Sequence, residues 1–536
     1  MVRVPGPFRH CLPYLAIRSV QSASSFGSFM TSQSAVDRTG AVHFIKWASG
    51  GALLLSALQL LIGGDPIIIC LCLFCQAICL FPVYLYGLSR TVGVLYVFIW
   101  LTFGFSSLLG KTILFQPIDS NLFNPLLTFC VTLAGSIAFT VAATAAYFVK
   151  PLQKNATPPI IDHETLNIMA FVFVVIGIFT YFVYLFLPKG SPILNIAAIF
   201  APYFSYGYVF SLCSNICRTR KNKVLSYSSL VLIFLFLYFG IAGNSKTSII
   251  QIALGYLLCV FAFRVKIKWP VVVLGFLVLA FFSEYLFPAI HITRAYKDRL
   301  NPAQVAIATV QTMGNLLVGD PDTLAVKDSL IAQGAEGDPD RYQNVYFGTQ
   351  QVWLDRFTNT GFIDAVARRV DFNGPFLGPQ FILQQTLGFL PRPLDPDKST
   401  SHAVAGGDQV TQAFGLTSRD QSNFSTVPLP INLFVADGFW FIFAIGVPLI
   451  FIFIVEINFF AFDMRDNVWS IVVIMTYGML FCVSTYDVYI FAIVRQIPTN
   501  LLMFSLMIVA AKAIQSGFAR AARASAPPTR LPRLSS

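Results

Sequence analysis

Long apolar runs alternate with short polar segments along most of the chain. The runs lie near 42–63, 66–87, 91–109, 122–149, 166–187, 192–212, 224–242, 247–263, 270–289, 433–455, 468–485 and 488–511. Each is close to the roughly 20 residues that a helix needs to cross a bilayer, where backbone groups find partners only within a helix. The pattern predicts an all-α, polytopic membrane bundle of about twelve spans, with both termini on the same side.

One long polar segment, residues 290–432, separates the ninth run from the tenth. Within it, apolar residues recur at near-helical spacing over 305–317 and 362–370, which predicts two amphipathic helices. Residues 376–390 are apolar but too short for a span, so an interfacial or re-entrant helix is expected there. Residues 391–430 are rich in turn-forming residues and are expected to be irregular. The segment is therefore predicted to be a large, partly helical loop outside the membrane.

Lysine and arginine are distributed unevenly between the two sets of short loops, and this bias sets the orientation of a membrane protein. One side collects Arg3, Arg9, Arg18, Arg38, Arg90, Lys150, Lys154, Arg218, Arg220, Lys221, Lys223, Arg264, Lys266, Lys268, Arg465, Arg520, Arg523, Arg530 and Arg533, whereas the short loops opposite hold Lys111, Lys189 and Lys246. The first side is predicted to be cytoplasmic. The expected divisions are a cytoplasmic tail (1–40, with Met30 as an alternative start to Met1), spans one to nine (41–289), the outer loop (290–432), spans ten to twelve (433–511) and a basic cytoplasmic tail (512–536).

Composition agrees with lipid as the solvent, because 56% of the 536 residues are hydrophobic, 11% are charged and the mean hydropathy is +0.69. The net charge of +11 follows from the cytoplasmic loops and does not indicate nucleic acid as a partner. Cys70, Cys72, Cys75 and Cys79 are spaced like metal ligands, but inside an apolar run they are interpreted as small hydrophobic residues. The outer loop contains no cysteine, so no disulfide is expected there.

The sequence has no nucleotide-binding, metalloprotease or nucleophile-elbow motif in a suitable setting, so nucleotide chemistry in the cytoplasm is not expected. The remaining candidates are polar residues at the outer face. His291, Arg294, Lys297 and Arg299 follow the ninth run on the side where basic residues are otherwise rare. They are interpreted either as phosphate-binding residues or as interfacial anchors.

Two other outer segments carry candidate chemistry. The GNSK turn before the eighth run contains Asn244, Ser245 and Lys246, which form either an anion site at a helix start or an ordinary cap. His402, in the large loop, is either a general base or part of the solvated surface.

Two ionisable residues lie inside apolar runs, Glu284 near the outer end of the ninth and Arg495 in the twelfth. Charges at such depth are costly, so they mark either function or pairing. Glu284 is expected to pair with a cation of segment 291–299, and Arg495 with an anionic ligand or with Asp487. Pairing for stability alone is an equal alternative.

This arrangement resembles that of the O-antigen polymerase and ligase group, membrane glycosyltransferases that act on undecaprenyl-diphosphate-linked glycans. The resemblance consists of the polar turn ending in Lys246, Arg294 beyond the ninth run, His402 in a large outer loop, and the Gly-aromatic entry ADGFWFIFAIG at 436–446. The family commonly has arginine at the turn and, in its ligases, asparagine after the loop histidine, where this chain has lysine and Ala403. The second departure favours a polymerase.

The resemblance implies a GT-C-like fold and a metal-independent, inverting glycosyltransferase that needs no cofactor. Such an enzyme polymerises lipid-linked repeat units into O-antigen or exopolysaccharide at the periplasmic face of the bacterial inner membrane. Its implied partners are undecaprenyl-diphosphate-linked glycans as donor and acceptor, membrane lipids and a chain-length regulator protein, with no nucleic acid.

The resemblance also implies roles for individual residues. The diphosphate would be held by Asn244, Ser245, Lys246, Arg294, Arg299 and Arg495, and the catalytic candidates are His402, Asp408 and Glu284. Either the histidine or the aspartate would take the proton of the acceptor hydroxyl. Fixed cations suit a leaving diphosphate, because negative charge develops on it in the transition state. Two alternatives stay open, an O-antigen ligase and a transporter or flippase of lipid-linked glycans.

Overall fold

The computed structural model describes residues 23–149, 163–186, 200, 202–243, 246–293, 300–336, 346–347, 358–387, 406–414, 427–465 and 467–525. Within these ranges every regular element is a helix and none is a strand. The all-α prediction is confirmed.

Every predicted apolar run overlaps a helix or a continuous series of helices. These are α1 (Ala23–Ile62), α2 (Pro66–Tyr86), α3 (Thr91–Trp100) with η1 (Leu101–Phe105) and α4 (Ser106–Ile113), α5 (Pro125–Tyr147), α6 (His163–Phe186), α8 (Tyr203–Arg218), α9 (Tyr227–Ala242), α10 (Lys246–Phe263), α11 (Trp269–Phe281) with η3 (Phe282–Leu286) and α12 (Phe287–Thr293), α19 (Phe439–Phe441) with η7 (Ile442–Gly446) and α20 (Val447–Phe460), α21 (Val468–Val483), and α22 (Tyr486–Phe491) with η8 (Ala492–Gln496) and α23 (Ile497–Ser525). In the part of the chain that is described, seven helical stretches are long and apolar enough to cross a membrane. By length and composition the chain is a multi-pass helical membrane protein.

Polar caps and prolines mark where several of these helices begin. Asp65 precedes Pro66, and its carboxylate accepts from the amide two residues on at 2.8 Å. Asn124 precedes Pro125, and its side chain accepts from the amide three residues on at 3.2 Å. A cap oxygen satisfies one of the free amides at a helix start, and proline has no amide hydrogen to satisfy. These starts are therefore determined by local sequence.

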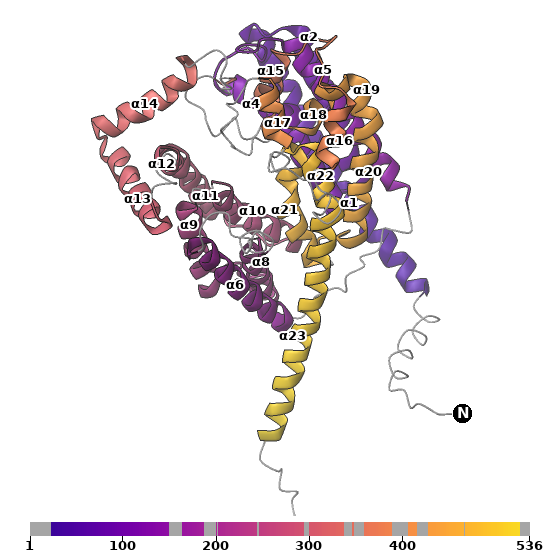
Figure 1. Cartoon of the computed structure of the whole chain (residues 1–536). Helices are drawn as coiled ribbons and strands as arrows, with labels where there is room; N and C mark the ends of the chain where they lie inside the picture. Colours follow the sequence, from indigo (N-terminus) through magenta and orange to yellow (C-terminus); the bar gives the residue numbers. More distant parts are fainter. Residues whose placement is uncertain are drawn as a thin grey trace, which may run out of the picture.

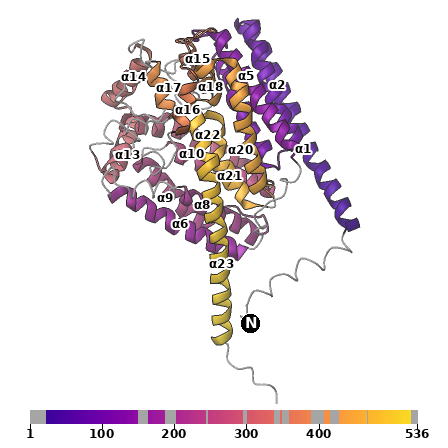
Figure 2. The same ribbon diagram turned by 45° about the vertical axis from the view of Figure 1, so that its right-hand side comes forward.

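The helices form two packed groups (Figure 1). One has α2, α3, α5 and α20 at its centre, and the other contains α6, α8, α9, α10 and α12. The groups meet where α21 packs against α8 and α10, and where α23 packs against α6. Helix α23 continues well beyond the bundle in both views (Figures 1 and 2).

Helices extend into both predicted tails. Helix α1 begins at Ala23, inside the expected tail 1–40, and α23 ends at Ser525, inside the expected tail 512–536. The second extension is rich in alanine, the residue with the highest helix propensity, so the helix continues after the apolar run has ended.

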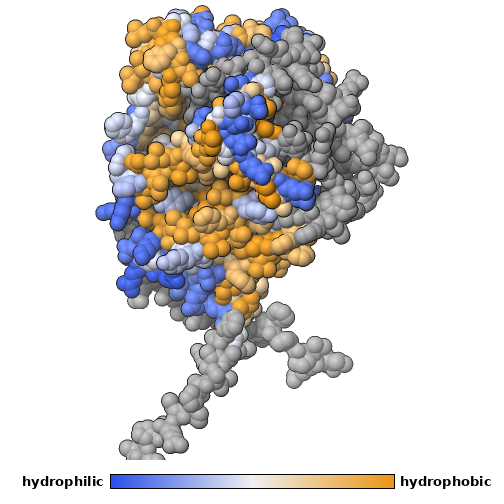
Figure 3. Space-filling model, turned by 90° about the vertical axis from the view of Figure 1, so that its left-hand side faces the viewer, coloured by the Kyte–Doolittle hydropathy of each residue, from blue (hydrophilic) through white to orange (hydrophobic). Residues whose placement is uncertain are grey.

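The surface of the described residues carries a broad apolar area. Figure 3 shows it across the middle of one face, with a further hydrophobic area at the upper left and hydrophilic residues at the lower left. Large side chains contribute to the exposed apolar surface, as at Phe171 (69% exposed), Phe179 (68%) and Phe234 (70%). Exposed aromatic residues in such numbers are unfavourable in water and favourable in lipid, which agrees with the membrane assignment.

The large loop contributes six helices to the described structure. They are α13 (Pro302–Val318), α14 (Pro321–Glu336), α15 (Thr360–Ala367), α16 (Pro379–Leu387), α17 (Gly406–Ala413) and α18 (Leu429–Asp437). Helices α13 and α15 confirm the two amphipathic helices expected from periodicity. Helix α16 confirms a short helix in the apolar segment 376–390.

Two expectations for the loop are wrong. Helix α17 lies within residues 391–430, which were expected to be irregular. The tenth span does not begin at 433, because α18 ends at Asp437 and Gly438 follows with φ +80°. This left-handed conformation stops the first helix, and a new one starts at Phe439.

The first half of the loop is fastened to the bundle by a buried carboxylate. Asp364 of α15 is 3% exposed and accepts from the backbone amides of Phe123 and Asn124, each at 2.9 Å, and from the hydroxyl of Thr128 at 3.1 Å. Burial raises the pKa of Asp364, while these hydrogen bonds act in the opposite direction. The amides belong to the start of α5, where a negative charge also interacts favourably with the helix dipole. The loop is therefore not an independent domain.

Asp364→Ala is expected to detach α15 from α5. It leaves two partly buried backbone amides without their acceptor, and hydrogen bonds to a charged group contribute about 1.5–3 kcal/mol. Hydrogen exchange should become faster at the amides of Phe123 and Asn124. The matched control is Asp371→Ala, since Asp371 is exposed and accepts only locally from the amide of Phe372. Unchanged exchange in Asp364→Ala would contradict the docking role.

Lys111, one of the three basic residues in the short outer loops, makes a second set of contacts between the large loop and the bundle. Its side chain is fully buried, with Nζ 2.8 Å from both the carbonyl and the hydroxyl of Ser120 and 3.1 Å from Gln116 Oε1. The ammonium also lies 4.4 Å from the centre of the Tyr346 ring. Tyr346 donates to the carbonyl of Ile118 at 2.9 Å. A distant piece of the loop is thus held against the turn that precedes α5.

Candidate functional site

The turn between α21 and α22 is the point at which the second half of the loop meets the bundle. Helices α16, α17 and α18 all pack against α22, and they lie together in the upper half of Figure 1. The hydroxyl of Tyr486, the first residue of α22, lies 3.1 Å from Thr386 Oγ1 of α16. The backbone amide of Tyr486 donates to Asn432 Oδ1 of α18 at 3.2 Å. One residue therefore joins two loop helices to a membrane helix.

Two buried carboxamides at this junction have atoms without partners among the described residues. Gln385, beside Thr386 on α16, is 3% exposed, and neither its Oε1 nor its Nε2 has a hydrogen-bond partner. Asn432 is fully buried, and its Nδ2 has no partner. Each such atom costs about 1–3 kcal/mol when it is left unpaired. We call Gln385 and Asn432 the amide cluster.

Aromatic rings pack around Phe434 near the end of α18. The Phe434 ring lies 4.8 Å from that of Phe439 and 5.7 Å from that of Phe376, measured between centroids. The backbone before α16 is tied to the end of α18, since Leu377 and Gly378 donate to carbonyls of α18 at 2.8 Å. The junction is thus held by both backbone and side chains.

The chemistry of the amide cluster suits an uncharged, hydroxyl-rich ligand. A carboxamide presents two donor hydrogens and an acceptor oxygen without a net charge. A sugar hydroxyl, which both donates and accepts, can satisfy the same groups. The arrangement can bind and orient such a ligand, but the amides themselves supply no acid or base.

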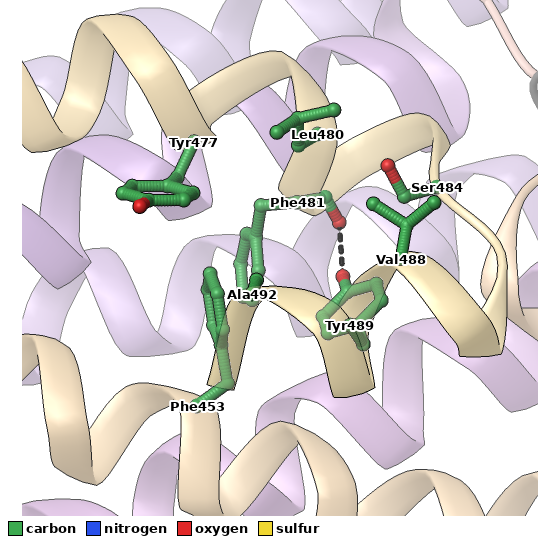
Figure 4. A pocket seen from close by; sticks show the side chains of 8 residues that line it. All are labelled: Phe453, Tyr477, Leu480, Phe481, Ser484, Val488, Tyr489 and Ala492. Carbon is green, nitrogen blue, oxygen red and sulfur yellow. Dashed lines mark hydrogen bonds between the residues drawn. The ribbon is translucent and has the colours of Figure 1, made fainter. Parts of the chain in front are cut away.

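A small cavity lies beneath this junction, among α20, α21 and α22 (Figure 4). Its volume is about 10 Å³, and its lining includes the rings of Phe453, Phe481 and Tyr489. The hydroxyl of Tyr489 donates to the carbonyl of Phe481. This space holds at most one water molecule, so it is a packing gap under the site and not a substrate pocket.

Arg495 lies on the same continuous helix as Tyr486, nine residues further along the chain. It belongs to the π-helical turn η8, a wide turn that is frequent at functional sites. Its side chain is exposed, and the guanidinium lies 5.5 Å from the centre of the Phe491 ring. Asp487, which was considered as its partner, is 7% exposed and accepts from the hydroxyl of Thr485. The guanidinium is thus accessible to a ligand.

Most of the other predicted site residues lie outside the described parts of the chain. This is true of Asn244, Ser245, Arg294, Arg299 and His402, and of the side chains of Lys246 and Asp408. Lys246 is the first residue of α10 and Asp408 the third of α17. Because α17 packs against α22, Asp408 belongs to a helix of the same junction. The diphosphate-binding cluster and the general base stay predictions.

Glu284 has a different partner from the one expected. It lies in the π-helical turn η3, and its Oε1 is 2.9 Å from Nζ of Lys327 in the loop helix α14. The side chains of Glu284 and Lys327 are 64% and 21% exposed. This lysine lies far along the sequence, and pairing with Arg294, Lys297 or Arg299 stays a prediction, because those residues lie outside the described ranges. The pair ties α14 to the continuous helix formed by α11, η3 and α12.

Reversing the Glu284 and Lys327 pair tests its role. An exposed ion pair contributes about 0–1 kcal/mol, so Glu284→Lys should lower thermal stability only slightly. The double exchange Glu284→Lys with Lys327→Glu should restore the stability of the wild type. A catalytic Glu284 predicts a different outcome, in which activity stays lost although stability returns.

No family model matches this chain. No curated protein and no solved structure is significantly similar to it either. Its function must therefore be argued from its own residues and their geometry.

The amide cluster and one acidic residue were missed by the sequence reasoning. Asn432 is a single polar residue in an apolar segment, and Gln385 stands between Gln384 and Thr386, so neither residue was distinguished by its neighbours in the sequence. Glu456 lies in α20, in the run FIFIVEINFF, one residue beyond the predicted end of the tenth span. Its Oε2 is buried and has no partner among the residues described. Extending the predicted span by one turn would have revealed it as an ion within the membrane.

Proposed function

We propose that this chain is a membrane glycosyltransferase that polymerises undecaprenyl-diphosphate-linked oligosaccharide repeat units into O-antigen or exopolysaccharide. It transfers the nascent chain to the acceptor sugar of a new lipid-linked unit. The enzyme is inverting and metal-independent, has about twelve spans in a GT-C-like arrangement, and acts at the periplasmic face of the bacterial inner membrane with both termini in the cytoplasm.

The observation that carries the proposal is the amide cluster at the junction between loop and bundle. A transferase for lipid-linked glycans needs a sugar-binding surface next to the end of a membrane helix. Gln385 and Asn432 supply uncharged donors and acceptors there, and Arg495 lies on the same continuous helix as Tyr486. The distance between Tyr486 and Arg495 is about 14 Å along the helix axis, which is compatible with a sugar at one and a phosphate at the other.

The proposed reaction is a substitution at the anomeric carbon of the donor. A hydroxyl oxygen of the acceptor sugar forms a bond to that carbon, and the bond from the carbon to the diphosphate oxygen breaks. Undecaprenyl diphosphate leaves with the electron pair, and its charge is stabilised by Lys246, Arg294, Arg299 and Arg495. The proton of the acceptor hydroxyl goes to His402 or Asp408.

The grouping of the turns into two sides is supported by contacts between turns that were assigned to the same side. At the face assigned to the cytoplasm, the turn at Arg90 pairs with the turn at Asp463. At the other end, the amide of Asp65 donates to Asp119 at 3.0 Å. Each contact joins two turns that the charge bias places together.

Deletion of the gene in the organism that encodes it tests the proposal through the lengths of the surface glycans. Loss of a polymerase should leave single repeat units on the final acceptor. Loss of a ligase should leave only lipid-linked polymer, and loss of a flippase should leave single lipid-linked units on the cytoplasmic face. The second and third outcomes would each overturn the proposal.

A further inference from the structure

A second polar site lies at the opposite end of α21 from the amide cluster. The turn between α2 and α3 meets the turn between α20 and α21 there, since Thr91 donates to the carbonyl of Phe462 at 3.1 Å and Met464 to that of Ser89 at 3.0 Å. The 16 residues of α21 separate the two sites by about 24 Å. The site is therefore independent of the proposed reaction.

Arg90 is the central residue of this site. Its guanidinium lies 4.6 Å from the centre of the Phe462 ring and 6.0 Å from that of Tyr147, which are distances typical of cation–π contacts. Its Nη1 is buried and has no hydrogen-bond partner in the described part of the chain. An unpaired charged donor is costly to bury, so an acceptor is needed at this position.

The neighbouring acidic residue is already engaged by another arginine. Asp463 Oδ2 lies 2.9 Å from Nη2 of Arg465, and Asp463 Oδ1 also accepts from the backbone amide of Arg465 at 2.9 Å. This pair leaves Arg90 with a positive charge that no ion pair balances within the described ranges. The acceptor that completes the site is therefore expected to be an anion.

The side-chain amide of Asn458, on the same side of the bundle, has an oxygen atom that lacks a donor in the described structure. Asn458 of α20 is 3% exposed, and its Oδ1 has no partner among the described residues. Its Nδ2 donates to the hydroxyl of Tyr86 at 3.4 Å, and that hydroxyl donates to the carbonyl of Ala143 at 3.0 Å. The site thus lacks an acceptor for Arg90 and a donor for Asn458.

We propose that Arg90 and Asn458 bind a phosphate ester whose source is the headgroup of an anionic membrane lipid. The phosphate oxygens accept from Arg90, and a headgroup hydroxyl donates to Asn458. Basic pockets between membrane helices at the cytoplasmic surface recognise anionic headgroups in this way. Phosphatidylglycerol has both the charge and the hydroxyls, whereas phosphatidylcholine neutralises its own phosphate and has no donor.

Native mass spectrometry of the purified full chain tests this site. Phosphatidylglycerol, phosphatidylcholine or inorganic phosphate is added in separate arms. The wild type is expected to retain phosphatidylglycerol selectively, and Arg90→Met should reduce the bound fraction about tenfold or more, because a charge-assisted contact is lost. Arg218→Met is the matched control, because Arg218 lies on α8, in the other group of helices, and donates to Asn215 Oδ1 at 3.0 Å; it should retain the lipid.

Three results would overturn the proposal. These are equal lipid retention by the wild type and Arg90→Met, equal loss in Arg218→Met, and binding of inorganic phosphate without selective retention of the lipid. Arg90→Lys covers the case in which Arg90→Met does not fold, because it keeps the charge but loses the planar fork. It is expected to retain less phosphatidylglycerol than the wild type, and retention equal to wild type would also count against the site.

Discussion

Alanine at Lys246 or at Arg294 is expected to remove polymer while the full-length protein stays in the membrane. Both residues are assigned to the leaving diphosphate, which gains negative charge as the bond to the anomeric carbon breaks. Removing one fixed donor from such a site typically lowers the rate by about 10²–10³-fold. Gel analysis of surface glycans should then show single repeat units in place of a ladder.

Charge-conserving variants separate this role from a structural one. Lys246→Arg keeps the charge and introduces the residue that is common at this turn in the O-antigen polymerase and ligase group, so polymer should be retained. Arg294→Lys keeps the charge but loses the bidentate fork, so an intermediate loss is expected. Polymer of wild-type length in both alanine variants would remove the two residues from the mechanism.

The helices could be predicted because their causes are local. The length of each apolar run determines whether a helix can span a bilayer, and caps such as Asp65 and Asn124 determine where it starts. The interruption at Gly438 was not predicted, since its φ of +80° depends on how α18 meets α19. Helix α17 was missed because eight residues give too short a periodic signal to outweigh their turn-forming composition.

The candidate site was only partly predictable, because its contacts join residues far apart in the sequence. Thr386 and Tyr486 are 100 residues apart, and Tyr486 and Asn432 are 54 apart. Charged residues are conspicuous within apolar runs, so Arg495 and Glu284 were predicted as site residues. Gln385 carries no charge and was not predicted. A buried carboxamide can be recognised as a candidate ligand-binding group only when the structure shows its burial and its unpaired atoms.

Gln385→Met is expected to raise stability and to abolish polymer. Methionine has a similar volume and removes two buried polar atoms that have no partners among the described residues, so the folded state should gain about 1–3 kcal/mol for each atom. If the amide binds a sugar hydroxyl, the same change should lower the polymerisation rate by about 10²-fold or more, because a buried site built for hydrogen bonding rejects a group that cannot make the bond. Thermal unfolding and glycan chain length measure the two effects separately.

The neighbouring Gln384 provides the matched control, since it is the same residue type on the same helix but is exposed. Gln384→Met should change neither stability nor polymer length by a measurable amount. A structural role for Gln385 predicts the opposite combination, in which Gln385→Met loses stability and polymer together. Higher stability with normal polymer would show that the amide has no ligand, and the sugar-binding assignment of the amide cluster would then be wrong. Only the combination of higher stability with lost polymer fits a group that is kept for binding at a cost to the fold.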